Sequence, residues 1–551
     1  MSTTTLSGIS ALAPGAPSVS VLIRFCNEIR YLDAVLRAVR AQSYPGQVEI
    51  LAVDNESTDG SRQVADRYAD RVLSISGYRP GRALNESVAA CTGDYLVPLS
   101  AHALPASRLW LTTLVAHLRN PDAIGVYGAQ VYPQYSKFLD KRDLDIFSDT
   151  RPRTECRDSD FWNANSAFPR RCWHERQFDE TVIELEDHLW TKELLPGDGS
   201  RWVRFEPDAI VYHYGHDVRN DRQFVPEGGR PSEVLIDEAL SAISARDAPW
   251  SVRMSAGLTL SSLNAAPGIA RAVRPIGELL LTDPDFDVRW RMAGALGRIA
   301  ATDAVPYLIA GLKDSSFYPQ DECAWSLARL GAQSVQPLLT ALSGLDVCHM
   351  PFAALALGMS GVRDGEQAAL QLIVDCLRSC DQVVERDALY FLGEMPVGTA
   401  ARGMVGEVLA RTTDSSDRTV RSAVWCWGKL AESTPGLVGL DTIAEVARLH
   451  AVDAVRAEAV TAVGRATQGR GEHLDRALLR SLMHDGSGRV RYAAMQSIRL
   501  MAALGSDVRR VVAACDIDPD FGTEFERSLV IGADADHRAS ALPPVFGLKG
   551  R

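Results

Sequence analysis

The sequence predicts two architectures in one chain, an α/β domain with a mostly parallel sheet followed by an all-α solenoid. Two observations lead to this prediction. Strand-like and helix-like segments alternate over roughly the first 230 residues, as in sheets that carry helices on both faces. From about Trp250 onward the pattern is helical only, and it repeats along the chain. A length of 551 residues is in keeping with more than one domain.

Short apolar runs rich in β-branched residues mark the expected strands of the first domain. They cover residues 19–23, 48–53, 71–75 and 95–99, and helical segments are expected at residues 31–42 and 61–70. This alternation predicts a Rossmann-like sheet, whose ligands bind beyond the carboxyl ends of the strands. Functional side chains are therefore expected directly after Ile23, Val53 and Leu99.

The repeats are marked by a Val-Arg pair that opens an Ala/Leu-rich helix. The pairs begin at Val252, Val288, Val420, Val455 and Val490. Neighbouring pairs lie 35 or 36 residues apart, and the 132-residue gap accommodates four units of 33, with helices expected at residues 322–330, 351–359 and 386–393. Paired helices at this period are typical of an α-solenoid, in which each unit buries its apolar face against its neighbours. The pattern resembles HEAT-like repeats.

These patterns divide the chain at approximate boundaries. We expect a disordered tail at residues 1–17, the α/β domain at 18–230, a linker at 231–247, the solenoid at 248–518 and a C-terminal tail at 519–551. The junction is placed here because Pro226, Gly228, Gly229 and Pro231 interrupt regular structure.

The composition argues against several classes of protein. A net charge of −12 gives no basic surface for nucleic acid, and no apolar run is long enough to span a bilayer. The first 17 residues lack the basic and apolar regions of a signal peptide. Ten cysteines without a Cys-x-x-Cys pair are typical of free thiols in a reducing compartment, so we expect a cytoplasmic protein. The scarcity of lysine among the 58 basic residues favours a GC-rich bacterial genome.

Two polar runs follow the first two expected strands. Residues 19–28 read VSVLIRFCNE and residues 49–61 read EILAVDNESTDGS. Together they resemble the opening of family 2 glycosyltransferases of the GT-A fold. The resemblance implies a nucleotide pocket at the end of the second strand, where Asp54 and Asn55 contact the donor, with Arg24 as a further donor-binding residue. Taken alone, the second run is equally suited to a turn that caps a helix.

Two further segments resemble the donor site of this family. In residues 81–85 the resemblance implies that Arg82 approaches the diphosphate, although an arginine here can equally be a solvated surface residue. Residues 161–167 read FWNANSA and resemble the lining of the sugar site. There Trp162 would offer a stacking face, and Asn163 and Asn165 would offer amides to hydroxyl groups. A core position for Trp162 is about as probable.

The metal motif of the family is altered in this chain. Where the family places Asp-x-Asp, the sequence has Ser100-Ala101-His102, and the resemblance implies a further metal or diphosphate contact at His213, with His216 as a weaker candidate. One imidazole can still bind a divalent ion, and it suits Mn²⁺ better than Mg²⁺. If His102 and His213 converge, we expect a divalent metal there and Ser100 on the donor; otherwise a cationic pocket must neutralise the leaving group.

The segment at residues 184–190, ELEDHLW, resembles the Glu-Asp motif of the family. The resemblance implies that Asp187 is the catalytic base of an inverting transfer, that Glu186 orients it or binds the acceptor, and that Trp190 flanks the sugar. Out of context, an acidic first turn of a helix explains the same residues. The position of the segment, between residues 161–167 and 204–213, favours the catalytic interpretation because the motifs occur in the order of the family over about residues 18–217.

The sequence therefore predicts an inverting glycosyltransferase that moves a sugar from a nucleoside-diphosphate donor to a soluble acceptor, either a peptide or protein or a natural product. UDP is favoured because it is common in the family. The repeats are expected to bind the acceptor or to mediate formation of a homodimer. The alternative is a non-catalytic nucleotide-sugar-binding scaffold. It is considered because Ser100-Ala101-His102 replaces the Asp-x-Asp metal motif of the family. A lyase-like role of the repeats ranks last, because they show no catalytic cluster.

Overall fold

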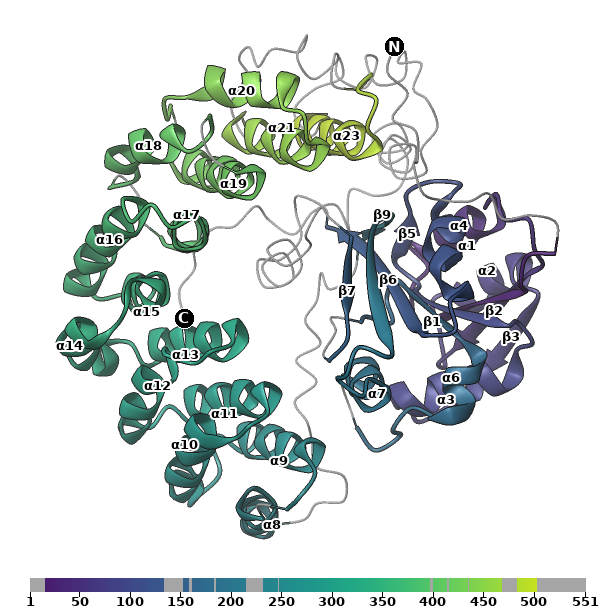
Figure 1. The fold of residues 1–551 in the computed structure, drawn as a ribbon, viewed down its shortest axis with the longest axis horizontal. Helices are drawn as coiled ribbons and strands as arrows, with labels where there is room; N and C mark the ends of the chain where they lie inside the picture. Colours follow the sequence, from purple (N-terminus) through teal and green to yellow (C-terminus); the bar gives the residue numbers. More distant parts are fainter. Residues whose placement is uncertain are drawn as a thin grey trace. The chain divides into compact units, whose positions relative to one another are not determined.

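The computed structural model describes residues 15–132, 152–157, 161–182, 185–214, 231–245, 247–396, 400–413, 416–434, 436–467 and 483–502. These residues fall into two compact units. The described part of the first unit ends at Tyr214, and the described part of the second begins at Pro231. Figure 1 shows a sheet with its helices in the first unit and a succession of helices in the second.

The first unit is built on one mixed sheet. Along its main path the strand order is β3-β2-β1-β4-β8-β6-β9-β5, and β7 pairs with β9. The strands are β1 (Val19–Phe25), β2 (Val48–Asp54), β3 (Arg71–Ser74), β4 (Tyr95–Ser100), β5 (Ala103–Pro105), β6 (Ala123–Val131), β7 (Arg153–Glu155), β8 (Ser166–Pro169) and β9 (Trp202–His213).

The two halves of this sheet differ in strand direction. Strands β1 to β4 pair in parallel, and all four lie where the sequence predicted them. The second half is different, because β8 is antiparallel to β4 and β6, and β5 and β7 are antiparallel to β9. The predicted α/β class is confirmed, whereas the mostly parallel sheet is limited to the first half and to the β6–β9 pair.

The strands of the parallel half end side by side. Phe25 lies opposite Asp54, and Arg24 lies opposite Ser100. The carboxyl ends of β1, β2 and β4 therefore form one edge of the sheet, which is the edge where doubly wound folds bind ligands.

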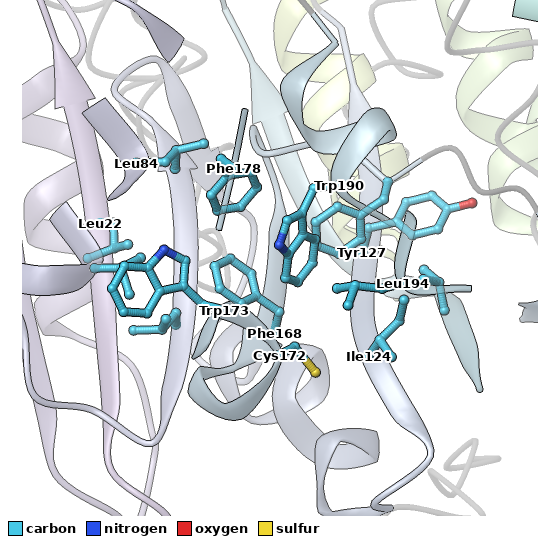
Figure 2. Close-up of a cluster of buried hydrophobic side chains, with 14 of the residues drawn as sticks. Leu22, Leu84, Ile124, Tyr127, Phe168, Cys172, Trp173, Phe178, Trp190 and Leu194 are labelled. Carbon is cyan, nitrogen blue, oxygen red and sulfur yellow. The ribbon is translucent and has the colours of Figure 1, made fainter. Parts of the chain in front are cut away.

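Helices cover both faces of the sheet and enclose an aromatic core. They are α1 (Leu32–Arg40), α2 (Ser61–Tyr68), α3 (Pro80–Ala90), α4 (Trp110–Val115), the 3₁₀ turn η1 (Ala116–Arg119), α6 (Arg170–Glu175) and α7 (Glu186–Leu194). Figure 2 shows the core, in which Trp190 of α7 lies among Phe168, Phe178 and Tyr127. The rings of Trp190 and Phe178 stack with centroids 5.0 Å apart. This packing fixes α7, and with it the residues at its first turn, against the sheet.

The second unit consists of two layers of helices in its described part (Figure 1). Each predicted repeat helix is present in one layer, which contains α9 (Trp250–Ser262), α11 (Phe286–Ile299), α13 (Phe317–Leu330), α15 (Met350–Gly358), α17 (Gln382–Glu394), α19 (Asp417–Ser433), α21 (Asp453–Thr467) and α23 (Gly488–Ala502). The other layer contains α10 (Val273–Thr282), α12 (Val305–Gly311), α14 (Ala332–Ala341), α16 (Arg363–Leu377), α18 (Ala401–Ala410) and α20 (Leu440–Leu449). Short 3₁₀ turns are η2 (Ile269–Ala272), η3 (Thr302–Ala304), η4 (Leu342–Gly344) and η5 (Val347–His349).

The helical region starts before the residue that the sequence indicated. Helix α8 (Ser232–Ser244) occupies most of the stretch predicted as a linker, residues 231–247, and packs against α9 and α10. Its buried residues Leu235, Ile236 and Ile243 form an apolar stripe that covers the first repeat. No helix in the described part of the chain is long and apolar enough to span a membrane.

The arginine of the Val-Arg pair ties one repeat to the turn that precedes the next. Arg253 donates from Nε to Oδ2 of Asp283 over 2.6 Å and from Nη2 to Oδ1 over 3.0 Å. Arg456 holds Asp485 in the same way, and Arg289 holds Asp314. In these three repeats the arginine of the Val-Arg pair and an aspartate of the following turn therefore form one recurring contact.

Candidate active site

The loops that follow β1 and β2 are locked together at the ligand-binding edge of the sheet. The amide of Thr58 donates to Oδ1 of Asn27 over 2.8 Å, and the amide of Asn27 donates to Oγ of Ser57 over 3.1 Å. Asp59 accepts from the amide of Ile29 over 3.0 Å. Asn27 has φ 56°, a left-handed conformation that few residues other than glycine adopt. These contacts explain why the second polar run has the residues of a turn, and they hold the two loops in a rigid arrangement at this edge of the sheet.

The side chains at the end of β2 remain partly available to a ligand. Asp54 is buried and accepts from the amide of Ser57 over 3.0 Å through Oδ1, while Nη1 of Arg62 lies 3.7 Å from Oδ2. The amide of Asn55 donates to the carbonyl of Phe25 over 3.0 Å. The side-chain Oδ1 of Asn55 is buried and has no hydrogen-bond partner within the described residues. A buried acceptor without a partner is costly unless a ligand or water supplies a donor.

The predicted catalytic base stands at the first turn of α7. Helix α7 begins after Leu185, which has φ 61° and turns the chain sharply into the helix. Oδ2 of Asp187 accepts from the backbone amide of Asn163 over 2.7 Å, and Oδ1 accepts from the amide of His188 over 2.9 Å. The carboxylate is therefore fixed in one orientation by two segments that are far apart in the sequence, 161–167 and 185–190.

Burial and a neighbouring charge raise the pKa of Asp187. Burial of the side chain, together with the negative charge of Glu186, raises the pKa of Asp187 to about 7, against the hydrogen bonds from Asn163 and His188. Arg24 reaches this pair from β1, with Nη1 3.7 Å from Oε1 of Glu186 and 3.3 Å from the hydroxyl of Tyr78. Burial lowers the pKa of Arg24, but Tyr78, Glu186 and Asp187 together outweigh it and raise that pKa, so the guanidinium remains charged.

Asn163 contacts the carboxylates of both Asp187 and Glu186. Besides its backbone bond to Asp187, its Nδ2 lies 3.4 Å from Oε1 of Glu186. The side chain is 3% exposed, and its Oδ1 has no hydrogen-bond partner in the described structure. The predicted binding role of Asn163 thus agrees with an acceptor that stands ready for a hydroxyl group.

The two predicted metal-binding histidines lie next to each other. Strand β5 pairs with β9 so that Ala103 lies opposite His213, and the amide of Tyr214 donates to the carbonyl of His102 over 2.9 Å. The imidazole rings of His102 and His213 stack, with centroids 4.9 Å apart and planes inclined by 20°. The predicted convergence of these residues is therefore present in the structure, but the rings meet face to face.

Whether these side chains fit a divalent ion depends on where their nitrogens point. A metal ion lies close to the plane of the imidazole that binds it, so two rings that stack with planes inclined by 20° are poorly oriented to share one ion. Nδ1 of His102 lies 2.9 Å from Oε1 of Glu28, a carboxylate–histidine pair of the kind that stands behind many metal-bound imidazoles. No group of three or more His, Cys, Asp or Glu side chains in the described part of the chain is arranged to hold a metal. Among the described side chains, His102 is therefore the one imidazole suited to a divalent ion, and the carboxylate of Glu28 contacts its Nδ1.

Trp190 and Asn165, both predicted to bind the donor, are buried in the core of the first unit. Trp190 is 1% exposed within the aromatic core (Figure 2), and its Nε1 donates to the carbonyl of Arg176 over 2.7 Å, so its indole is not available to a sugar. Asn165 is fully buried, and its amide is used by Trp110, Ala129 and Ala209, so it is a structural residue.

Arg82 also lies apart from the cluster around Asp187. Its side chain is 50% exposed and pairs with Glu86 one helical turn along α3 over 2.7 Å. Trp162 is partly buried and packs against the core, as one of its two interpretations required. Ser100, at the end of β4, donates its amide to the carbonyl of Ala164 over 3.3 Å and so connects the strand end to the 161–167 segment. The weaker candidate His216 lies outside the described residues.

Two residues that contact the paired histidines His102 and His213 were not assigned a role from the sequence. Glu28 lies in the first polar run, and Tyr132 follows β6 and contacts His213, its hydroxyl 2.7 Å from Nδ1. The Asn-Glu pair that ends the first polar run was the available signal for Glu28. Nothing in the sequence around Tyr132 marks it, because its partner is 81 residues away.

The chain matches two family models. Residues 20–182 match the model for glycosyl transferase family 2, and residues 273–347 match the model for HEAT repeats. The first unit thus carries a family 2 glycosyltransferase domain and the second carries HEAT repeats, which confirms both resemblances seen in the sequence. A curated relative, glycosyltransferase AglE of Haloferax volcanii, is 26% identical over 208 residues, which are 36% of this chain and 67% of that protein.

Three of the solved structures similar to this chain have TM-scores of 0.30, 0.34 and 0.29, which do not establish a common fold for the whole chain. The mannosyltransferase PcManGT of Pyrobaculum calidifontis is 19% identical, with 54% of this chain and 88% of that chain covered and a TM-score of 0.30. TarS of S. aureus, residues 1–349, is 13% identical, with 60% and 92% covered and a TM-score of 0.34. Glucosyl-3-phosphoglycerate synthase of Mycobacterium tuberculosis is 16% identical, with 45% and 80% covered and a TM-score of 0.29.

Proposed function

We propose that the first unit transfers a sugar from a nucleoside-diphosphate donor to a soluble acceptor with inversion at the anomeric carbon, and that Asp187 is the base. The family 2 match and the relative AglE support a glycosyltransferase. The observation that carries the proposed mechanism is the setting of Asp187, a buried carboxylate held by two backbone amides, whose pKa is raised to about 7.

The chemistry of an inverting transfer requires one base on the acceptor side. As the acceptor oxygen attacks the anomeric carbon, its proton passes to the carboxylate of Asp187, and the bond from that carbon to the diphosphate oxygen breaks with its electron pair. A base works best when its pKa is near the working pH, because it is then ionised and still accepts a proton readily. A pKa of about 7 meets this condition, whereas an ordinary aspartate is a much weaker base.

The neighbours of Asp187 support this role. Nη1 of Arg24 lies 3.7 Å from Oε1 of Glu186, which supports a role of Glu186 in orienting the acceptor beside Asp187. The Oδ1 of Asn163, which has no hydrogen-bond partner among the described residues, is available to accept from a sugar or acceptor hydroxyl. We assign Asp54 and Asn55 to the nucleotide, since the end of β2 offers one carboxylate and one amide oxygen there. UDP remains the favoured nucleotide on the family resemblance alone.

A divalent ion, Mn²⁺ or Mg²⁺, is part of the proposal. When bound, it would supply Lewis-acid stabilisation of the negative charge on the departing diphosphate. His102 is the described side chain suited to hold it, and Ser100 lies two residues before it at the end of β4. Arg24 adds positive charge on the same edge of the sheet, beside Ser100 in the strand register.

We further propose that the HEAT repeats bind the acceptor, a peptide, protein or natural product, with formation of a homodimer as the other role. A repeat stack offers a long surface that suits an extended ligand. A chain that ends at Asn220, before α8 and the repeats, should keep donor hydrolysis, which shows that the first unit is folded, and lose acceptor affinity. Unchanged acceptor kinetics in that chain would remove the acceptor role of the repeats.

The test of the proposed function is a panel of nucleotide sugars assayed for donor hydrolysis and transfer. We expect turnover with at least one donor and a loss of about 10²- to 10⁴-fold in Asp187→Asn, the usual contribution of a general base. The matched control is Asp198→Asn, an exposed aspartate in the loop after α7, which should leave activity unchanged. Full activity in Asp187→Asn would disprove the assignment of the base.

The altered Ser100-Ala101-His102 motif is compatible with a second function, that of a scaffold that binds nucleotide sugars without hydrolysing or transferring them. The stacked histidines favour this alternative, because they do not form a shared metal site. Calorimetric titration with UDP, GDP and dTDP, with and without Mn²⁺, combined with the donor-hydrolysis assay, separates the two. Nucleotide binding combined with no hydrolysis of any donor would support the scaffold.

A further inference from the structure

We infer that the HEAT repeats hold a binding site for a phosphate group, formed by Arg465 of α21 and Lys429 of α19. This inference goes beyond the proposed function, which leaves open the chemistry that the repeats recognise. It concerns the second unit alone, so it does not depend on sugar transfer by the first unit.

The site lies where three helices of one layer follow one another. Helix α19 packs against α17 on one side and against α21 on the other (Figure 1). The rings of Tyr390 on α17 and Trp425 on α19 stack with centroids 4.8 Å apart, and both side chains are buried. Lys429 lies one helical turn beyond Trp425, with its Nζ 5.9 Å from the centroid of the Trp425 ring. The ammonium group is therefore held beside an aromatic surface that joins two repeats.

Arg465 reaches the same place from α21. A Cβ atom at Gly428 would come within 2.8 Å of the Cβ of Ala462, so glycine allows α21 to approach α19 closely at this point. The same Cβ would lie 3.7 Å from Cδ of Arg465. The stem of the Arg465 side chain therefore lies against the backbone of α19 at Gly428, the residue directly before Lys429.

Arg465 lacks the acceptor that its burial requires. The residue is 6% exposed, and its buried Nη1 has no hydrogen-bond partner among the described residues. Arg456 on the same helix is different, because its Nε and Nη2 donate to the two carboxylate oxygens of Asp485 over 3.1 and 2.9 Å. Burial of a guanidinium without such a partner is strongly unfavourable. A ligand with acceptor oxygens would remove that cost.

The charges around Lys429 point to the same kind of ligand. Burial and the positive charge of Arg465 lower the pKa of Lys429, and the carboxylates of Glu394 and Glu432, which raise it, do not compensate. Glu458, a buried carboxylate of α21, lies seven residues before Arg465, about 10 Å along the helix axis. The described surroundings thus hold too little negative charge for two neighbouring cations, and an anion bound to both would supply it.

The donor set favours phosphate among the common anions. A guanidinium presents its N–H groups in a planar fork, and an ammonium group presents three further donors. A phosphate group has three strong acceptor oxygens and carries nearly two negative charges at neutral pH, so it accepts from both side chains at once. A carboxylate has two oxygens and a single charge, so it satisfies Arg465 and Lys429 less fully.

The experiment uses the full chain as wild type, Arg465→Gln and Lys429→Gln, in a buffer without phosphate and divalent ions. Inorganic phosphate, glucose-6-phosphate and acetate are titrated separately by calorimetry. We expect each substitution to weaken phosphate by about 10- to 100-fold, the usual effect of removing one charged hydrogen-bond donor. Equal affinities for phosphate and glucose-6-phosphate would identify the free ion as the ligand. Tighter binding of glucose-6-phosphate would identify a phosphate group carried on a larger molecule.

A control and a stability measurement accompany the titrations. Arg274 is an exposed arginine of α10 that pairs with Glu278 over 2.8 Å, so Arg274→Gln should leave the phosphate affinity unchanged. Arg465→Met replaces the buried charge by an apolar side chain, so its thermal midpoint without phosphate should be higher than that of the wild type. Phosphate should raise the midpoint of the wild type by mass action but not that of Arg465→Met. This comparison shows directly whether the variant is folded.

Three results would overturn the inference. The first is a wild type that binds phosphate no more tightly than acetate, and the second is a phosphate affinity that is unchanged in Arg465→Gln. The third is an Arg465→Met variant that is less stable than the wild type without phosphate and is stabilised by phosphate to the same extent. None of these results bears on the proposed function, because donor hydrolysis and sugar transfer are assayed in the first unit.

Discussion

The two units use buried arginine–carboxylate pairs in opposite ways. In the HEAT repeats, Arg253 binds Asp283 through two short hydrogen bonds, so that both charged groups are satisfied within the protein. In the glycosyltransferase domain, Arg24 lies 3.7 Å from Glu186 and also contacts Tyr78, while Asp187 has no arginine bonded to it among the described residues and its pKa is raised. Saturated pairs hold a fold together, and loosely paired charges keep their capacity for a ligand.

The largest expected effect concerns the saturated pair. Arg253→Ala leaves Asp283 buried and unpaired, and breaking a buried pair in this way costs about 3–5 kcal/mol. We expect a large drop in the thermal midpoint of the second unit, measured by calorimetry, while donor hydrolysis at low temperature is unchanged. The double variant Arg253→Met with Asp283→Leu removes both charges and should recover much of the loss. Equal destabilisation in single and double variants would contradict the role of charge.

Arg24 should show the reverse behaviour. In Arg24→Gln the positive charge beside Glu186 and Asp187 is lost, and electrostatic groups of this kind contribute about 10²- to 10³-fold to rate. We expect transfer to fall by that factor with little change in the thermal midpoint. The control is Arg37→Gln, an exposed arginine that pairs with Asp33 on α1 and should leave the rate unchanged. If Arg24→Gln lowers the thermal midpoint strongly, while the folded fraction of the variant transfers sugar at the wild-type rate, Arg24 has a structural role like that of Arg253.

Because the pKa of Asp187 is raised to about 7, both the transfer rate and the stability of the first unit should depend on pH. Because the base must be ionised, kcat/KM should rise about tenfold per pH unit up to about pH 7 and then level off. The stability has the opposite trend. Between the ordinary value of 3.8 and about 7 the folded state binds more protons at Asp187 than the unfolded state does, so raising the pH across this window lowers the stability.

Asp187→Asn separates these two trends, since asparagine does not titrate. The thermal midpoint of the wild type should fall relative to that of Asp187→Asn as the pH rises from about 4 to about 7, and the difference should then remain constant. A rate limb near pH 4, with no change in relative stability, would mean that Asp187 is an ordinary solvated carboxylate.

The sequence predicted the parts of the fold that depend on local pattern. Strands β1 to β4 and the repeat helices α9 to α23 were predicted because apolar runs and Val-Arg pairs mark them over short stretches. The antiparallel half of the sheet was not, because β8 inserts between β4 and β6, a pairing across many residues that no local pattern records.

The site shows the same limit. Asp187, Glu186, Asn163 and Arg24 were found from motifs, and the structure brings them together. Trp190 and Asn165 lie in those same motifs but point into the core, since a motif does not tell which face of its element is buried. Glu28 was missed as a partner because His102 is 74 residues away in sequence.

The smallest expected effect is that of Arg82, and it decides how far the family resemblance extends to the diphosphate. Arg82 pairs with Glu86 on the exposed side of α3, in an ion pair that water screens. If the structure represents the donor-bound state as well, Arg82→Ala should leave the donor KM and kcat unchanged. A donor KM that rises in Arg82→Ala but not in Glu86→Gln would show that Arg82 leaves Glu86 when the diphosphate arrives. The exposed pair would then be a resting position, and Arg82 would belong with Arg24 among the charges kept for a ligand.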